Sequence, residues 1–168
     1  MGKLRITTAI MGLTAFMTVV PTAGATWAES GAAQARISPC NQYKGAHADG
    51  KFYAFASVDC GGYLGGDEGN DSDWGQSGGG FSGGDTDKAL SILNDGIDVG
   101  LHIVAVYDYT AYTSAQGYRC LDVGDWVPDL RPYSFVKPNG SLGVNMARQI
   151  SSHRWVARSA CTDASMIG

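Results

Sequence analysis

The chain has 168 residues, a formal net charge of −4 at pH 7, and 24 glycines. This length corresponds to a single domain, and glycine on this scale favours turns and irregular connections over long helices. A mildly acidic chain has no clustered basic surface of the kind that binds nucleic acid or anionic membranes, so both classes of partner are excluded.

The N-terminus has the pattern of a secretory signal peptide, predicted over residues 1–25. Lys3 and Arg5 precede the apolar run AIMGLTAFMTVV, and Ala23 and Ala25 form an A-x-A cleavage pattern. The run is too short for a comfortable membrane span, and no later apolar run is longer. We therefore expect a secreted, extracellular protein that keeps no membrane attachment after cleavage.

Short β-like runs follow an N-terminal extension. Residues 26–49 are small and polar without periodicity, and predict an irregular segment. Beyond it, aromatic and branched residues alternate with glycine, asparagine and proline turns, which is typical of an all-β domain. The predicted strands lie within 51–58, 99–109, 117–123 and 149–156, and residues 158–168 form a C-terminal tail.

An acidic, glycine-rich segment lies between the first strand and the rest of the domain. Carboxylates at alternate positions on a flexible backbone could wrap a cation, while the competing interpretation is a solvated loop. Glycine would also let this long connection lie over a sheet, with Trp74 and Phe81 as its large anchors. No metal is expected, and the candidate ligands, if one binds, are Asp67, Glu68, Asp71 and Asp73.

Four cysteines remain after the signal peptide, and an even number in an oxidising compartment predicts two disulfides. Three pairings are possible. We favour Cys40 with Cys60 and Cys120 with Cys161, because each bond would tie one terminal extension to one half of the domain. A zinc site is the rival interpretation, but the chain has no C-x-x-C or H-x-x-x-H spacing.

The chain contains a weak internal repeat. When the sequence is shifted by about 52 residues, Phe55 aligns with Tyr107 and the pair Asp73-Trp74 aligns with Asp125-Trp126. A period of about 52 residues is close to the periods of known repeat proteins. After the tryptophans the second copy has about nine extra residues, and with these counted Ser91 matches Ser152. The predicted copies are residues 50–97 and 98–157.

These repeats resemble the Greek-key motif of the βγ-crystallin family. The motif runs aromatic-x4-aromatic-x-Gly, followed by a serine that opens an apolar strand. The matching residues are Phe55, Gly62 and Ser91 in the first copy and Tyr107, Tyr112 and Ser152 in the second. Cys60 and Ser114 stand where the motif has an aromatic residue and a glycine. The resemblance covers residues 50–157 and implies a disulfide-stapled sandwich of two Greek keys.

The resemblance also implies roles for particular residues. The motif serine caps a folded hairpin by hydrogen bonding, so Ser91 and Ser152 are expected to be structural. The family binds calcium at segments of the form (Asn/Asp)2-x-x-(Ser/Thr)-Ser. Residues 86–91 have Leu90 at the fifth position, and residues 147–152 lack the carboxylate pair, so neither segment offers the oxygens that calcium needs. No cofactor is expected.

Catalysis is not expected either. In the stretch ARQISSHRWV, two serines precede His153, but a nucleophile and its base usually come from distant segments, and neighbours on a strand point to opposite faces. His47 lies in the extension and His102 in an apolar strand. We predict a binding protein that is not an enzyme.

Within its superfamily, the chain most resembles secreted actinobacterial proteins grouped with the metalloproteinase-inhibitor family. This implies a monomer that docks a rigid loop into an extracellular protease. The proline-rich residues 125–143 are the candidate loop, although they also suit a plain long connection. A non-inhibitory structural, stress-related or toxin-like protein, with or without residual calcium binding, remains open. The candidate partner-binding residues are Arg131, Tyr133, Phe135 and Lys137.

Overall fold

The computed structural model describes residues 39–47, 49–97 and 100–168. The predicted signal peptide lies outside these residues, as does most of the N-terminal extension. Within the described ranges, no helix has the length and hydropathy that a membrane crossing requires.

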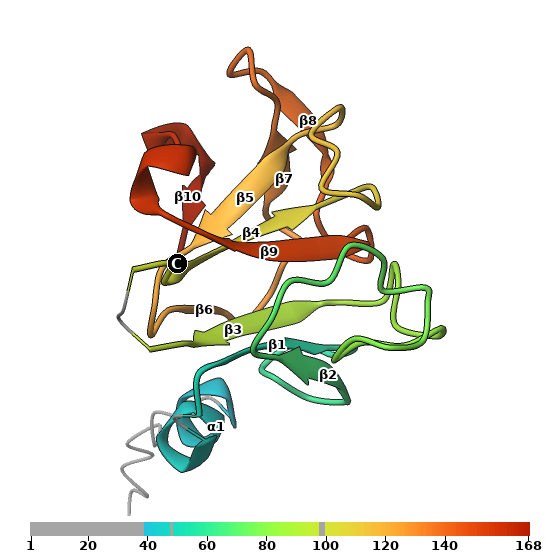
Figure 1. Ribbon diagram of the computed structural model, residues 1–168, viewed down its shortest axis with the longest axis vertical. Helices are drawn as coiled ribbons and strands as arrows, with labels where there is room; N and C mark the ends of the chain where they lie inside the picture. Colours follow the sequence, from blue (N-terminus) through green and yellow to red (C-terminus); the bar gives the residue numbers. More distant parts are fainter. Residues whose placement is uncertain (1–38, 48, 98–99) are drawn as a thin grey trace, which may run out of the picture. The chain divides into compact units, whose positions relative to one another are not determined.

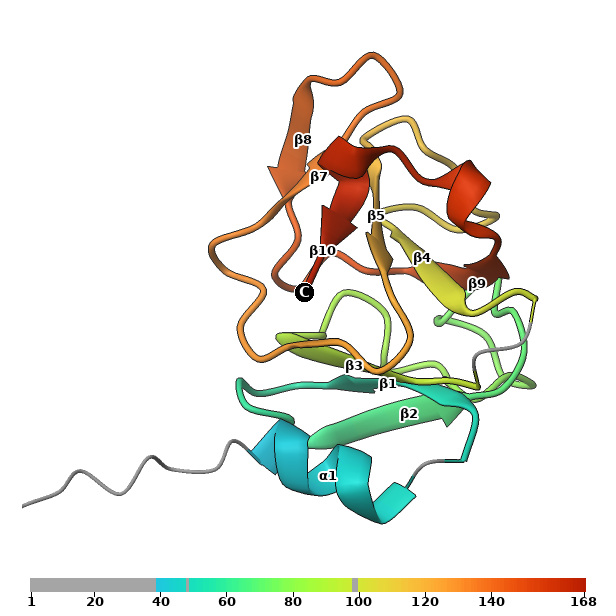
Figure 2. The ribbon, with the colours of Figure 1, turned by 90° about the vertical axis from the view of Figure 1, so that its left-hand side faces the viewer.

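Two sheets form the domain, antiparallel except at one short parallel pair at the C-terminus, in two layers that Figure 2 shows edge on. The first sheet has the order β2-β1-β3-β6, and the second has the order β8-β7-β5-β4-β9 with β10 paired to β5 (Figure 1). This confirms the predicted all-β class. The strands are β1 (Lys51–Phe55), β2 (Tyr63–Asp67), β3 (Ser91–Asp95), β4 (Ile103–Tyr107), β5 (Tyr118–Leu121), β6 (Trp126–Val127), β7 (Ser134–Val136), β8 (Leu142–Asn145), β9 (Ser152–Val156) and β10 (Met166–Ile167).

Each repeat is a Greek key whose third strand crosses to the other sheet. In the first copy, β3 returns to lie beside β1, as the fourth strand of a Greek key does. The third segment of that copy pairs with β9 through reciprocal bonds between the backbones of Asp71 and His153. The third strand of the second copy, β6, pairs in the same way with β3. The predicted sandwich of two Greek keys is therefore confirmed, and the copies are interlocked.

The repeat is real, but the tryptophans do not correspond. The backbone of Trp74 donates to Ser151, just before β9, and the backbone of Leu130 donates to Leu90, just before β3. Trp74 therefore matches Leu130, and the predicted match with Trp126 is wrong by four residues. The sequence misled because the β4–β5 connection of the second copy is longer than the β1–β2 connection of the first, so part of the extra length precedes Trp126.

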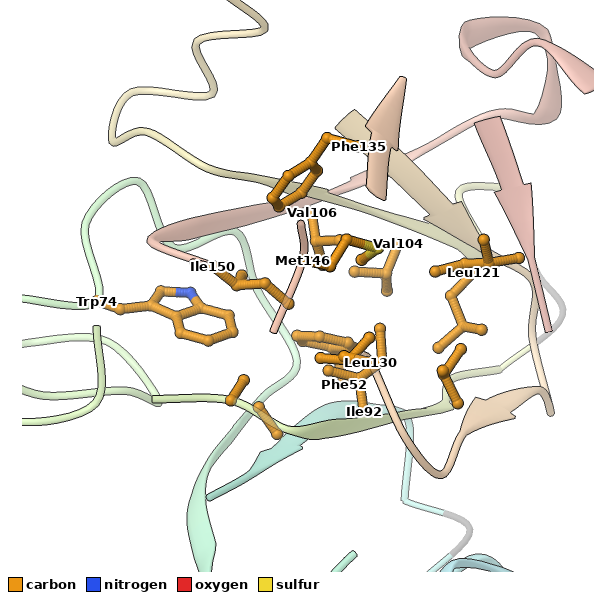
Figure 3. Close-up of a cluster of buried hydrophobic side chains, with 14 of the residues drawn as sticks. Phe52, Trp74, Ile92, Val104, Val106, Leu121, Leu130, Phe135, Met146 and Ile150 are labelled. Atoms are coloured by element: carbon orange, nitrogen blue, oxygen red, sulfur yellow. The ribbon is translucent and has the colours of Figure 1, made fainter. Parts of the chain in front are cut away.

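Apolar side chains from both copies fill the space between the sheets (Figure 3). On β1 and β4 the residues that face this core alternate with residues that face the outside of the sandwich, and both sets are buried. Trp74 stacks on Phe81 with ring centroids 4.0 Å apart and is fully buried, as the sequence predicted for an anchor of the glycine-rich segment. The labelled core residues are Phe52, Trp74, Ile92, Val104, Val106, Leu121, Leu130, Phe135, Met146 and Ile150.

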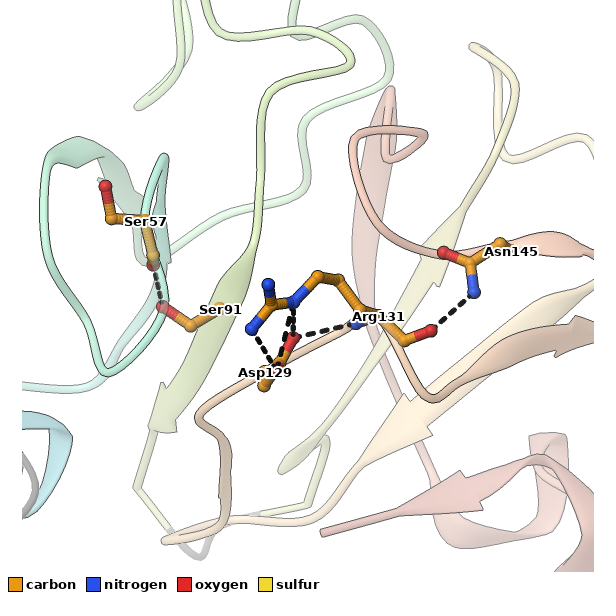
Figure 4. Close-up of polar contacts among 5 residues, drawn as sticks. All are labelled: Ser57, Ser91, Asp129, Arg131 and Asn145. Carbon is orange, nitrogen blue, oxygen red and sulfur yellow. Dashed lines mark hydrogen bonds and ion pairs between the residues drawn. The ribbon is translucent and has the colours of Figure 1, made fainter.

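Two serine hydroxyls close equivalent folded hairpins. Ser91 Oγ accepts from the Cys60 backbone at 2.9 Å and donates to the Ser57 carbonyl at 2.7 Å (Figure 4). Ser152 Oγ accepts from the Tyr112 backbone at 3.3 Å and donates to the Tyr109 carbonyl at 2.6 Å. Both serines are fully buried, so these bonds have no competition from water.

The backbone of these hairpins is unusual and the same in both copies. Asp59 and Cys60 have φ values of 54° and 56°, and Ala111 and Tyr112 have φ values of 55° and 58°. Such left-handed angles cost energy in residues other than glycine, so the surrounding contacts must hold them. The serine bonds at Cys60 and Tyr112 do so directly.

Both predicted disulfides are confirmed. Cys40 is bonded to Cys60, and Cys120 to Cys161. Each bond ties a terminal segment against the outer face of one sheet, as expected. The prediction of an irregular N-terminal extension is wrong for residues 39–47, which form helix α1 (Pro39–His47).

Helix α1 depends on tertiary contacts and not on its own pattern. Its first turn has no acidic residue, and an apolar periodicity is lacking. Cys40 and Tyr43 lie on one face, and the Tyr43 ring packs edge-on against Tyr53 and Phe55 with centroids 5.0 and 5.1 Å away. The C-terminal tail is ordered in a similar way, through two short 3-10 helices, η1 (Arg158–Ala160) and η2 (Asp163–Ser165), and β10.

We predict that both disulfides contribute to stability. The Cys120→Ala/Cys161→Ala variant should lose about 4 kcal/mol of unfolding free energy, and Cys40→Ala/Cys60→Ala about 3 kcal/mol, since the bonds close segments of 41 and 20 residues respectively. Urea unfolding of the variants measures both values. Unfolding curves that coincide with the curve of the oxidised parent would contradict this expectation.

The capping serines lead to a second prediction. Ser91→Ala and Ser152→Ala should each lower the unfolding free energy by about 1–3 kcal/mol, because each leaves a buried backbone donor and acceptor unsatisfied. Ser159→Ala, at an exposed position of η1, is the matched control and should stay within about 0.5 kcal/mol of the parent. A Ser152→Ala protein as stable as this control would show that the hydroxyl is dispensable.

Candidate functional sites

The acidic, glycine-rich segment is folded down onto β2. Gly65 and Gly80 make this possible: a Cβ on Gly65 would lie 2.4 Å from the Gly80 carbonyl oxygen, and one on Gly80 would lie 2.3 Å from the Gly66 oxygen. The predicted role of glycine in this connection is therefore confirmed. Asp67 receives backbone hydrogen bonds from Gly69 and Gly80, which hold the segment in place.

The candidate metal ligands do not all meet. Asp71 and Asp73 line one polar pocket of about 250 Å³, together with Ser72, Gln76 and Ser77. Glu68 is exposed and lines a different groove, and Asp67 lines neither. Within the described ranges, no three His, Cys, Asp or Glu side chains are grouped as a metal site.

His153 is a structural residue of the core. It is fully buried, and its Nδ1 accepts a hydrogen bond from the indole nitrogen of Trp74 at 3.0 Å. The other ring nitrogen, Nε2, then carries the proton and donates to the Gly69 carbonyl oxygen at 3.2 Å. Burial lowers the pKa of His153 to about 4, so the ring is neutral at pH 7.

This arrangement explains the SSH stretch. The hydroxyl of Ser152 is bonded to the hairpin backbone, while His153 faces the opposite side of the strand and joins β9 to the glycine-rich segment. Ser151 donates to Asp87, on the first copy. The three side chains have three separate partners, as expected for neighbours on an extended strand.

The two calcium-type segments meet across the repeats, which reasoning on each segment alone missed. Thr86 and Asp87 of the first segment contact the Ser151 hydroxyl of the second, at 3.2 and 2.9 Å. At the opposite junction the backbone of Arg148 donates to the carbonyl of Ala89, the neighbour of Leu90, so the cation and the missing hydroxyl fall together there. Asp87 and Arg148 occupy matching positions with φ values of 58° and 59°. The two junctions therefore have the same backbone conformation but carry different side chains.

Burial raises the pKa of Asp108, and the nearby negative charge of Asp87 raises it further. Asp108 lies at the end of β4 and is almost fully buried. The sequence gives no sign of this proximity, because the two aspartates belong to different copies.

The proline-rich residues 125–143 contain β6, a connection and most of the β7–β8 hairpin, and this hairpin projects from the sheet (Figure 1). Arg131 is well exposed, with Tyr133 and Lys137 half-buried. Phe135 was expected to contact a partner, but this prediction is wrong: Phe135 is fully buried in the core. Successive side chains on β7 point to opposite faces of the sheet, and the side chain of Phe135 is on the face that packs in the core.

Two apolar side chains on this hairpin were missed. Leu142 and Val144 on β8 are exposed to 67% and 36%, while Gly143 between them packs so closely that a Cβ would lie 1.7 Å from the Gln116 carbonyl oxygen. The alternation in SLGVN was the available signal. A second apolar surface, a groove of about 360 Å³, is lined in part by Ile97, Leu101 and Trp155.

No protein-family model and no curated protein matches the chain. Among solved structures, it is similar to a βγ-crystallin from Ciona intestinalis, with 19% identity and a TM-score of 0.44 over 64% of this chain and 100% of that one. It is also similar to a structure titled as a study of the evolution of the eye lens βγ-crystallin domain fold, with 18% identity and a TM-score of 0.43 over 64% of this chain and 86% of that one. The Greek-key assignment follows from the strand order and the exchange of third strands.

The buried imidazole predicts a pH dependence. An unfolded histidine binds its proton below a pKa of 6.5, whereas folded His153 binds it only near pH 4, so stability falls as the pH drops through this window. The part of the unfolding free energy that is lost because His153 titrates should approach about 3 kcal/mol at pH 4. Urea unfolding of the parent and of His153→Gln between about pH 7 and pH 4 isolates it, since other groups titrate alike in both. Parallel pH profiles for the two proteins would contradict the prediction.

Proposed function

We propose that this protein is a secreted inhibitor-like binding protein that engages an extracellular protease through the β7–β8 hairpin. The observation that carries the proposal is a firmly held hairpin that projects from the sheet and presents uncovered apolar side chains. The disulfides support an oxidising, extracellular setting.

The hairpin is held in shape by its own polar contacts. At its tip, Gly140 donates to the Lys137 carbonyl at 2.8 Å and completes a turn in which Pro138 fixes the backbone. At its base, the Asn145 side chain donates to the Arg131 carbonyl at 2.7 Å (Figure 4). Such a hairpin loses little conformational entropy when it docks.

Arg131 is fixed by Asp129. Its Nε lies 2.9 Å from Oδ1 and its Nη2 lies 2.7 Å from Oδ2, a two-point pairing that matches the planar guanidinium. The same bonds lower the pKa of Asp129. The guanidinium stays exposed, so it is presented to solvent in a set orientation.

The contact surface is the outer side of β8. This strand is at the end of its sheet, so its outer backbone groups have no strand partner among the described residues. An unpaired edge can add an extended segment of another protein as a further strand. Leu142 and Val144 point the same way from this edge and supply apolar contact.

The test is inhibition of a panel of secreted metalloproteases and serine proteases by the purified protein without residues 1–25. We expect inhibition of at least one enzyme at micromolar protein. Leu142→Ser/Val144→Ser should weaken that inhibition about tenfold or more, because central apolar contacts carry most of the energy of an interface. Its melting temperature should stay close to that of the parent, since both side chains are exposed.

The matched control is Ile97→Ser/Leu101→Ser, which makes the same chemical change at two exposed side chains on a different surface. This control should inhibit like the parent. Equal inhibition by both double variants would remove the hairpin from the contact. A panel with no inhibited enzyme would overturn the protease proposal and favour a non-inhibitory extracellular role.

A further inference from the structure

We propose that a corner of the larger sheet, here called the Arg154 corner, is a docking surface for a carboxylate-bearing segment of a partner protein. The corner consists of Tyr107, Tyr112 and Arg154, on the outer face of the sheet. Arg154 lies on β9, at the opposite end of this sheet from β8. The proposal therefore concerns a different surface from the β7–β8 hairpin and does not depend on protease inhibition.

The first observation is that the guanidinium of Arg154 is held in one orientation. Its Cζ lies 5.5 Å from the ring centroids of both Tyr107 and Tyr112, and aromatic faces attract a cation. Its Nε also donates a hydrogen bond to the Tyr107 hydroxyl at 2.9 Å. The side chain is nevertheless exposed, so little further ordering is needed when a ligand binds to it.

The second observation is that this fixed guanidinium has no anionic partner. Among the described residues, Nη1 and Nη2 of Arg154 form no hydrogen bond and no ion pair. The other arginines that are held in place do have partners: Arg119 donates to two backbone carbonyls, and Arg131 and Arg158 pair with aspartates. A planar guanidinium with free outer nitrogens can receive both oxygens of a carboxylate.

The third observation is that the matching corner of the first copy is occupied. Its residues, at the same positions of the repeat, are Phe55, Cys60 and Leu93. Helix α1 covers them through the Cys40–Cys60 disulfide and through Tyr43, which packs on Phe55. In the second copy the C-terminal tail is bonded at Cys120, and no described residue of this tail forms a hydrogen bond or ion pair with Arg154. The repeat therefore has a docking position that α1 fills in one copy only.

The surroundings of the guanidinium indicate the chemistry of the partner. The rings of Tyr112 and Tyr118 are partly exposed, and Tyr118 stacks on Tyr107 with centroids 6.1 Å apart. A simple inorganic anion would contact the guanidinium alone, whereas a peptide segment could also contact these rings. Tyrosine and arginine are enriched among the residues that contribute most to protein interfaces. A segment with an aspartate or glutamate beside an apolar side chain would use both parts of the surface.

The experiment is a titration of the protein without residues 1–25 with a capped Glu-Leu-Glu-Leu-Glu peptide near neutral pH. Nuclear magnetic resonance of the Arg154 side-chain Nε–H reports contact at the corner, and calorimetry gives the affinity. We expect a saturable shift of this signal, with a dissociation constant of about 1 mM or less. A capped Gln-Leu-Gln-Leu-Gln peptide should bind at least about tenfold more weakly, because it lacks the charge that strengthens the hydrogen bonds.

Variants locate the site by calorimetry. Arg154→Gln should weaken peptide binding at least about tenfold, and Arg154→Lys should recover only part of it, because lysine keeps the charge but lacks the planar pair of donors. The matched control is Arg148→Gln, which removes an exposed arginine whose side chain has no hydrogen bond or ion pair in the described part of the chain. This control should bind like the parent. If Arg154→Gln fails to fold, Arg154→Lys decides.

Four outcomes would overturn the proposal. The first is no saturable binding of the acidic peptide by the parent, and the second is full binding by the Arg154 variants. The third is an equal loss of binding in Arg148→Gln, which would indicate attraction by overall charge. The fourth is a shift of the Arg154 signal by inorganic sulfate at the concentrations at which the peptide acts, which would indicate a simple anion site.

Discussion

The exchange of third strands is the constraint on which the rest of the structure depends. Residues 71–74 of the first copy pair with β9, and β6 of the second copy pairs with β3. Neither copy can complete its sheet alone, so both fold as one unit. The exchange also brings Trp74 and Leu130 to matching positions in a shared core. The connections that leave these segments are the glycine-rich segment and the β7–β8 hairpin.

The two copies use the same backbone for different purposes. In the first, the connection after Trp74 is rich in glycine and acid, packs flat on β2 and hides Asp71. In the second, the connection after Leu130 folds into a projecting hairpin with an exposed apolar edge. Described basic residues are concentrated in the second copy, whereas acidic residues dominate the first.

The outer faces of the sheets are closed by the chain ends. Helix α1 covers Tyr53 and Phe55 through Tyr43, and the C-terminal segment packs Met166 against the cluster around Cys120. Each segment is too short and too weakly patterned to fold by itself, so a disulfide holds it where packing alone would be marginal. A domain with both faces covered in this way leaves β8 as an open edge at one end of the larger sheet.

The sequence by itself determined the all-β class, because aromatic and branched runs between turn residues are a local property. It favoured one of three disulfide pairings, and the resemblance of its repeats implied the capping roles of Ser91 and Ser152. The sequence also indicated a hairpin in the proline-rich stretch. It placed Phe135 outside the core, because a stretch rich in proline and aromatic residues does not reveal which face of a strand is buried. Tertiary structure alone decided the match of Trp74 with Leu130, the helix at residues 39–47 and the neutral His153. Each of these depends on contacts between the two copies or between a chain end and a sheet, and such contacts leave no periodic signal in the chain.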